Sequence, residues 1–151
     1  YGALGLKVAE WMLNQGAKYL VLLGRHGVSE KAKEIITKME ETGTKIVIIQ
    51  ADVSNQDDMK RVLDNISAAM PILRGIVHAA GVLDDGILLQ QNWERFSKVL
   101  APKVQGAWNL HLLTQNLTLD FFVCFSSATS LLGSPGQGNY AAANAFLDAL
   151  A

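Results

Sequence analysis

The chain has 151 residues, half of them hydrophobic, which is enough for one domain with a sizeable core. Its 13 basic and 14 acidic residues nearly balance, so no electrostatic feature favours nucleic acid or an anionic membrane as a partner. With a single cysteine, Cys124, and no apolar run near the roughly 20 residues that span a bilayer, we expect a soluble, cytoplasmic protein without an intrachain disulfide.

Short apolar runs rich in β-branched residues alternate with longer segments of helical periodicity. In chain order the pattern predicts a helix over 4–14, a strand over 19–23, a helix over 29–41, a strand over 45–50, a helix over 56–69, a strand over 75–78, a helix over 92–115 with a break near Pro102, a strand over 121–126 and a helix over 139–151. This alternation predicts an α/β fold, a Rossmann-like doubly wound parallel sheet with helices on both faces.

The two ends of the chain depart from that fold. Tyr1-Gly2-Ala3-Leu4-Gly5 leads directly into a helix, without the strand that normally precedes a glycine-rich turn. That strand is central in the order 3-2-1-4-5-6, so its absence would leave the strands at 19–23 and 75–78 without a neighbour for their amides. We therefore expect residues 1–151 to be a single domain that is truncated at both ends, without its first strand and its C-terminal strands.

The first part of the chain has features of a cofactor site. Gly2 and Gly5, at a helix start, resemble the second half of a dinucleotide-binding turn, in which helix amides hold a pyrophosphate; an ordinary tight turn is the alternative. Arg25, after the strand at 19–23, suits the 2′-phosphate of NADP, although it could be a solvated surface arginine. Asp52 could accept a hydrogen bond from the adenine amino group, but aspartate is also common at turns before helices.

The strand at 75–78 ends in His78-Ala79-Ala80-Gly81, whose small residues would let the backbone lie against a ribose and a nicotinamide. A hydrogen-bonded structural role suits His78 better than a role as a base.

A hydroxyl, a phenol and an amide follow in the last part of the chain, at Ser126-Ser127, Tyr140 and Asn144. A carbonyl group could meet all three. Because a phenol has an unperturbed pKa of about 10, a proton-donating tyrosine needs a nearby cation at neutral pH, and Lys103 is the candidate. On its own, the pair Tyr140 and Asn144 could equally be the polar face of a helix start. No residue is predicted to bind a metal.

These residues resemble the ketoreductase domains of modular polyketide synthases, a branch of the short-chain dehydrogenase/reductases, over essentially the whole chain. Seven segments match the family's motifs in the same order along the chain, which is unlikely to occur by chance. They are Tyr1-Gly2-Ala3-Leu4-Gly5, Leu23-Gly24-Arg25, Ala51-Asp52-Val53, His78-Ala79-Ala80-Gly81-Val82-Leu83-Asp84-Asp85, Pro102-Lys103-Val104, Phe125-Ser126-Ser127 and Gly136-Gln137-Gly138-Asn139-Tyr140.

The resemblance implies a single NADP-binding catalytic domain that reduces the β-keto group of an acyl thioester. The substrate would be carried on an acyl carrier protein, and other synthase domains would share the polypeptide. The implied NADPH contacts are Gly2, Leu4, Gly5, Arg25, Asp52, Val53, His78, Ala79, Ala80, Gly81, Lys103 and Tyr140.

The resemblance also implies a catalytic role for each polar residue. Tyr140 would donate the proton, Ser127 would hydrogen-bond the carbonyl oxygen, Lys103 would favour the phenolate and Asn144 would order the proton relay. As in that branch, lysine and asparagine are exchanged relative to ordinary superfamily members. Side chains alternate along an extended strand, so only one of Ser126 and Ser127 should face the substrate. We choose Ser127 because it is the serine that matches the family's alignment.

Leu83-Asp84-Asp85 resembles the fingerprint of ketoreductases that form a D-configured β-alcohol; an acidic turn is the alternative. The tryptophan of the opposite type is missing from 131–135, and Ala142 replaces the proline of the subtype that acts on epimerised substrates. Two other functions stay open: a stand-alone short-chain reductase for a small ketone, and a non-catalytic NADP-binding scaffold.

Overall fold

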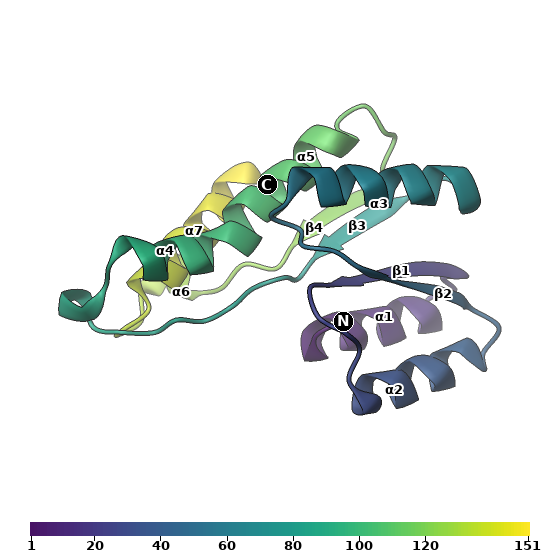
Figure 1. Cartoon of the computed structure of the whole chain (residues 1–151), viewed down its shortest axis with the longest axis horizontal. Helices are drawn as coiled ribbons and strands as arrows, with labels where there is room; N and C mark the ends of the chain where they lie inside the picture. The colour runs from purple at the N-terminus through teal and green to yellow at the C-terminus, as the bar shows by residue number, and fades with distance from the viewer. The chain divides into compact units, whose positions relative to one another are not determined.

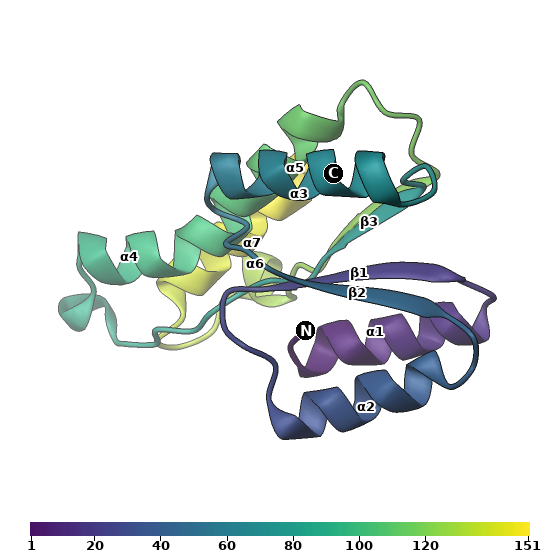
Figure 2. The ribbon, with the colours of Figure 1, turned by 45° about the vertical axis from the view of Figure 1, so that its right-hand side comes forward.

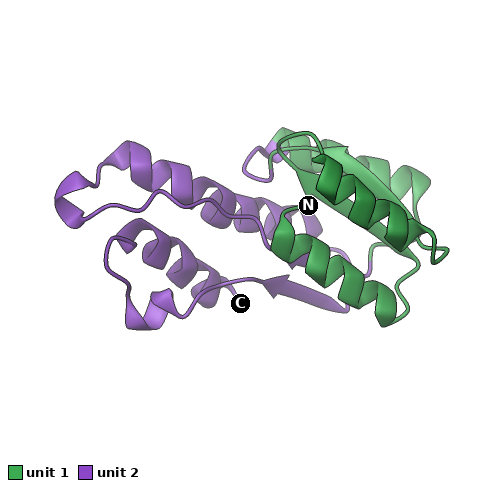
Figure 3. Cartoon of the chain, turned by 90° about the horizontal axis from the view of Figure 1, so that it is seen from below, with its two compact units in different colours: residues 1–52, 57–73 green, residues 53–56, 74–151 purple.

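The computed structural model describes residues 1–151 and contains two compact units. Unit 1 comprises residues 1–52 and 57–73, and unit 2 comprises residues 53–56 and 74–151 (Figure 3). The elements in chain order are α1 (Ala3–Asn14), β1 (Tyr19–Gly24), α2 (Glu30–Glu40), β2 (Lys45–Gln50), α3 (Gln56–Ala69), β3 (Gly75–His78), η1 (Leu88–Gln90), α4 (Trp93–Leu100), η2 (Ala101–Gln105), α5 (Gly106–Thr114), β4 (Phe121–Cys124), α6 (Thr129–Leu132) and α7 (Gly138–Leu150) (Figure 1). No helix combines the length and apolar character that crossing a bilayer requires.

Unit 1 is built on the parallel pair β1 and β2, in which Leu20 is opposite Ile46. Parallel strands need a crossover, and α2 provides it. In Figures 1 and 2, α1 and α2 lie on one face of this pair. The core between these elements is a single apolar cluster of Leu6, Ala9, Leu20, Ala32, Ile36, Met39 and Ile46.

Unit 2 contains the second parallel pair, β3 and β4, with His78 opposite Cys124 at its carboxyl end. At the other end, the Phe121 ring lies over Gly75, where a Cβ would overlap it, so a larger residue at this position would require the ring to move. Helix α7 packs against α4, α6 and η2. The strand ends and the start of α7 therefore belong to the same unit.

The predicted helices and strands are confirmed, most of their bounds to within one residue. The predicted break near Pro102 is confirmed: α4 ends at Leu100, and the π-helical segment η2, which contains Pro102, separates it from α5. Proline lacks an N–H, and a wider turn can accommodate the missing hydrogen bond. Strand β4 ends at Cys124 rather than at Ser126, and the short helices η1 and α6 were not predicted.

Candidate active site

Lys103 connects the end of β4 with the first turn of α7. Its side chain is only 4% exposed, and its Nζ donates a 3.0 Å hydrogen bond to the backbone carbonyl of Phe125. The same Nζ lies 5.3 Å from the centroid of the Tyr140 ring. The structure therefore brings together the predicted cation and the predicted phenol, which are far apart in the sequence.

The surroundings of Lys103 leave little spare room. A Cβ on Gly81 would lie 3.2 Å from the Lys103 Cε, so the backbone at the end of the His78–Gly81 segment passes directly beside the lysine stem. Burial lowers the pKa of the Lys103 ammonium below its usual value. A poorly hydrated ammonium interacts more strongly with a neighbouring negative charge than one in water does.

Asn144 lies one helical turn after Tyr140 on α7, and its side chain is completely buried. Its Nδ2 donates a 2.8 Å hydrogen bond to the backbone carbonyl of Tyr140. Its Oδ1 is also buried and accepts no hydrogen bond from the protein. A buried amide oxygen of this kind suits an ordered water, which a proton relay requires.

The structure separates Ser126 from Ser127, but not for the predicted reason. Both follow the end of β4, so alternation along a strand does not decide between them. The Ser126 Oγ donates to the Asn144 backbone carbonyl at 3.3 Å, whereas the Ser127 Oγ accepts from the backbone N–H and the hydroxyl of Thr129 at 3.2 and 3.0 Å. Because both bonds to Ser127 are accepted ones, its own O–H remains to donate to a ligand.

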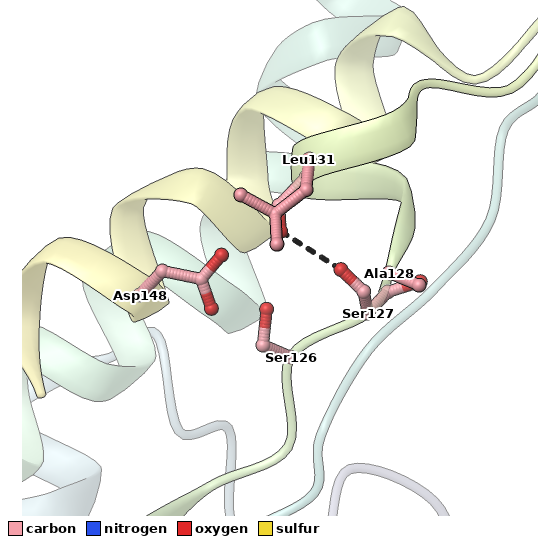
Figure 4. Close-up of a pocket in the computed structure, with 6 residues that line it drawn as sticks. Ser126, Ser127, Ala128, Leu131 and Asp148 are labelled. Carbon is pink, nitrogen blue, oxygen red and sulfur yellow. Dashed lines mark hydrogen bonds between the residues drawn. The ribbon is translucent and has the colours of Figure 1, made fainter.

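An open pocket adjoins these serines (Figure 4). Asp148, one turn beyond Asn144, faces this pocket from α7, and the neighbouring Ser126 and Ser130 hydroxyls hold the pKa of its carboxyl below the usual value. Sequence reasoning missed Asp148, although its helical spacing from Tyr140 and Asn144 indicates a shared face. The pocket is lined by Ser126, Ser127, Ala128, Ser130, Leu131 and Asp148.

His78, at the end of β3, is 3% exposed, and its Nε2 has no hydrogen-bond partner. Burial, together with the charge of Lys103, lowers the pKa of His78 to about 4, while a hydrogen bond to the Pro102 carbonyl opposes the shift. The imidazole is therefore neutral near pH 7. Of the two ring nitrogens, only one has a hydrogen-bond partner, the Pro102 carbonyl.

This shift predicts a loss of stability in acid. Below pH 6.5 an unfolded His78 takes up a proton that the folded chain does not accept until about pH 4. The free energy of unfolding should therefore fall by about 3 kcal/mol as pH drops through this window. Denaturant titrations between pH 4 and 8 measure the slope, and His78→Gln should flatten it; an unchanged slope in that variant would assign the effect to other groups.

The segment Leu83–Asp85 is attached to α4 through Asp84. That carboxylate is 17% exposed and accepts from Arg95 and Lys98 at 2.7 and 2.8 Å. Hydrogen bonds from Lys98 and then Arg95 hold the pKa of Asp84 below its usual value. Leu83, in contrast, is 59% exposed. Asp84 is thus occupied in holding the segment, whereas Leu83 remains accessible to a ligand.

Unit 1 offers features that fit the phosphates of a dinucleotide. A Cβ on Gly2 or Gly5 would meet no atom within 4 Å, so the protein's own packing does not explain these glycines. Gly2 is the N-cap of α1, which has no side-chain cap and no acidic residue in its first turn, and Leu4 beside it is 49% exposed. Arg25 is exposed after β1. Open backbone, free helix amides and an accessible guanidinium are what an anionic group needs.

Asp52 and Val53 lie where β2 passes into α3. In unit 1, the Asp52 backbone N–H donates to the Asp58 carboxylate at 2.8 Å and is the main cause of the lowered pKa of Asp58. In unit 2, the Val53 carbonyl accepts a 3.0 Å hydrogen bond from Asn109, a buried residue that sequence reasoning missed. A Cβ on Gly106 would clash with Val53, so α5 holds this residue tightly.

Comparison with known proteins gives one consistent result. The family model described as "KR domain" matches residues 1–151. The chain is 44% identical to a phenolphthiocerol synthesis polyketide synthase type I of Mycobacterium marinum, over 99% of this chain and 7% of that protein. It is 47% identical to the polyketide synthase GfsA of Streptomyces halstedii, over 99% of this chain and 2% of that protein. A crystal structure of a ketoreductase domain from the bacillaene assembly line matches with a TM-score of 0.95 and 37% identity, over 99% of this chain and 36% of that one. The predicted α/β, Rossmann-like fold is confirmed by this match.

Proposed function

Because the chain belongs to the KR domain family of ketoreductases, we propose that it reduces the β-keto group of an acyl thioester during polyketide synthesis. The observation that carries the proposal is the position of the buried Lys103 ammonium, 5.3 Å from the Tyr140 ring and hydrogen-bonded to the strand end that leads to Ser127. These groups supply what the reduction of a carbonyl requires of a protein: a donor to the oxygen, an acid and a cation.

Each residue has a role that its contacts support. The free O–H of Ser127 binds the carbonyl oxygen of the substrate, and the Tyr140 phenol gives that oxygen its proton as negative charge develops there. Lys103 stabilises the resulting phenolate from a buried position. Asn144 supports proton resupply through its unpartnered Oδ1. NADPH, when bound, supplies the hydride that reaches the carbonyl carbon.

We propose NADPH as the cofactor. In unit 1, Gly2, Leu4 and Gly5 would hold the pyrophosphate, Arg25 the 2′-phosphate and Asp52 the adenine. Unit 2 carries the residues proposed for the nicotinamide half, which are Val53, His78, Ala79, Ala80, Gly81, Lys103 and Tyr140. The open space at Gly2 and Gly5 and the exposure of Arg25 support this assignment.

Arg25→Ala is expected to raise the Kd for NADPH about ten- to a hundredfold while changing that for NADH little. A charge-assisted contact with a phosphate contributes about 1.5–3 kcal/mol, and only NADPH carries the 2′-phosphate. Fluorescence titration of both cofactors measures the two constants. Lys31→Ala, which removes another exposed cation nearby in the sequence, is the control. Equal weakening of both cofactors would contradict a 2′-phosphate contact.

We also propose a carrier protein as the source of the substrate and a D-configured alcohol as the product. The chain spans less than a tenth of the length of the synthases it resembles, which supports other synthase domains in the same polypeptide. The exposed Leu83 beside the anchored Asp84 supports a stereochemical role for Leu83-Asp84-Asp85. The single cysteine supports a cytoplasmic location. We further propose that residues 1–151 belong to one catalytic domain.

Oxidation of NADPH by the purified full-length protein with a β-keto acyl thioester tests the function. The thioester should be supplied both on a carrier protein and as a small soluble mimic, and the alcohol resolved by chiral chromatography. We expect turnover and a D-alcohol. An L-alcohol would overturn the stereochemical assignment, a preference for small free ketones would favour a stand-alone reductase, and NADPH binding without any turnover would favour a scaffold.

A further inference from the structure

Tyr1 holds the loop that follows β1 in unit 1. Its ring lies on Gly24, where a Cβ would come within 2.7 Å of the ring atoms. Its hydroxyl donates to the His26 carbonyl and lies 3.3 Å from that of Gly24, while its main-chain nitrogen donates to the Leu23 carbonyl at 2.8 Å. One tyrosine therefore joins the start of the glycine turn to the loop that carries Arg25.

Gln50, at the end of β2, holds the same loop from the neighbouring strand. In the register of the two strands it lies opposite Gly24, and its Nε2 donates a 3.0 Å hydrogen bond to the Arg25 carbonyl. The next residue, Ala51, donates its N–H to the Gly24 carbonyl at 3.0 Å. The main-chain carbonyls of residues 24–26 therefore all accept hydrogen bonds from within unit 1.

Gln50 is itself held by helix α3. The Arg61 Nη2 donates to the Gln50 carbonyl at 3.3 Å and to the Asp58 carboxylate at 2.9 Å. Asp58 in turn accepts from the Asp52 N–H. The main chains of Arg25 and Asp52, which are proposed to bind the 2′-phosphate and the adenine, are thus held by side chains that do not belong to the proposed cofactor contacts.

Holding a loop in advance makes a phosphate contact on that loop stronger. An arginine on a mobile loop loses main-chain freedom when it binds, and that loss reduces affinity. The bonds described above restrain the Arg25 main chain, while the residue itself is exposed and accessible to a ligand. Because only NADPH carries a 2′-phosphate, a restrained Arg25 loop favours NADPH and not NADH.

We propose that Tyr1 and Gln50 are positioning residues that hold the Arg25 loop and thereby set the selectivity for NADPH over NADH. This inference rests on the proposed NADPH-dependent function. Neither side chain needs to touch the cofactor, because each acts through the main chain of residues 24–26. When either hydrogen bond is lost, the loop samples other conformations and the guanidinium meets the 2′-phosphate in a smaller fraction of the molecules.

The test measures cofactor binding by Tyr1→Phe and Gln50→Ala in the full-length protein. Phenylalanine keeps the ring on Gly24 and removes only the hydroxyl. Fluorescence titration should show the Kd for NADPH rising about three- to tenfold in each variant, with the Kd for NADH changed less than about twofold. Tyr19→Phe and Gln15→Ala are the matched controls, because both remove exposed polar groups of unit 1 from outside the loop, and both should bind as wild type.

Combination with Arg25→Ala tests whether the two residues act through the arginine. In that background neither Tyr1→Phe nor Gln50→Ala should weaken NADPH binding further, since the contact that they support is already lost. Additive losses would show that Tyr1 and Gln50 support cofactor binding independently of Arg25 and would overturn the proposal.

Two small probes give a readout that needs neither the nicotinamide nor turnover. Both substitutions should weaken binding of adenosine 2′,5′-bisphosphate and leave that of adenosine 5′-monophosphate unchanged. Equal weakening of both probes, or no change in either, would overturn the inference alone. An unmodified protein that binds NADPH and NADH equally would overturn the proposed cofactor and this inference with it, so the two failures are distinguishable.

Discussion

Tyr140→Phe is expected to lower kcat by about a thousandfold in the full-length protein while leaving the affinity for NADPH unchanged. The substitution removes only the phenolic O–H and keeps the ring beside Lys103, 5.3 Å from its Nζ. Without that proton, negative charge on the reduced oxygen has no matched acid to neutralise it. Steady-state kinetics with a β-keto acyl thioester and direct cofactor titration measure the two quantities.

Tyr19→Phe is a suitable control for the tyrosine experiment. Tyr19 is 52% exposed in β1 of unit 1, and the structure gives its hydroxyl no role in the candidate site. The control should keep wild-type kinetics. If Tyr140→Phe retained more than about a tenth of the activity, the proton would have to come from another donor, and Ser127 with a bound water would become the candidate.

Lys103→Met is expected to lower kcat about a hundredfold without lowering Tm. The change removes the buried ammonium and its hydrogen bond to the Phe125 carbonyl, while methionine fills most of the same space. The lowered pKa of Lys103 means that burying its charge costs folding free energy. An apolar side chain avoids this cost, so methionine should be tolerated at least as well as lysine. Kinetics and thermal unfolding of the same preparation separate the two effects.

Two further variants make the lysine experiment specific. Lys103→Arg should not restore full activity, because the Gly81 backbone passes beside the lysine stem and a guanidinium is wider than an ammonium. Lys38→Met, on the exposed side of α2, should behave as wild type. The pKa of His78 should also rise in Lys103→Met, since the lysine charge helps to lower it. Loss of activity together with a large drop in Tm would instead indicate a structural role for Lys103.

The strands and their parallel arrangement were predictable because they depend on local pattern. The runs at 45–50 and 75–78 coincide with β2 and β3, and the amphipathic period of α2 places Ala32, Ile36 and Met39 on its buried face. The break near Pro102 was predictable because proline interrupts α-helical hydrogen bonding, but the π-helical form that the chain adopts there was not. Ser126 was misplaced because the end of a strand depends on where its partner ends, and β3 ends at His78.

What the sequence by itself determined was the α/β class and the residue types of the candidate site: a phenol, an amide, a hydroxyl and a lysine in a recognisable order. These follow from periodicity and motif, which are properties of neighbouring residues. Only the tertiary structure decided that Lys103 approaches Tyr140, that Asp84 is bound by Arg95 and Lys98, and that Asn139 links Asp84 to Tyr140. Such contacts join segments far apart in the chain, and the burial that makes them strong arises only when the helices pack.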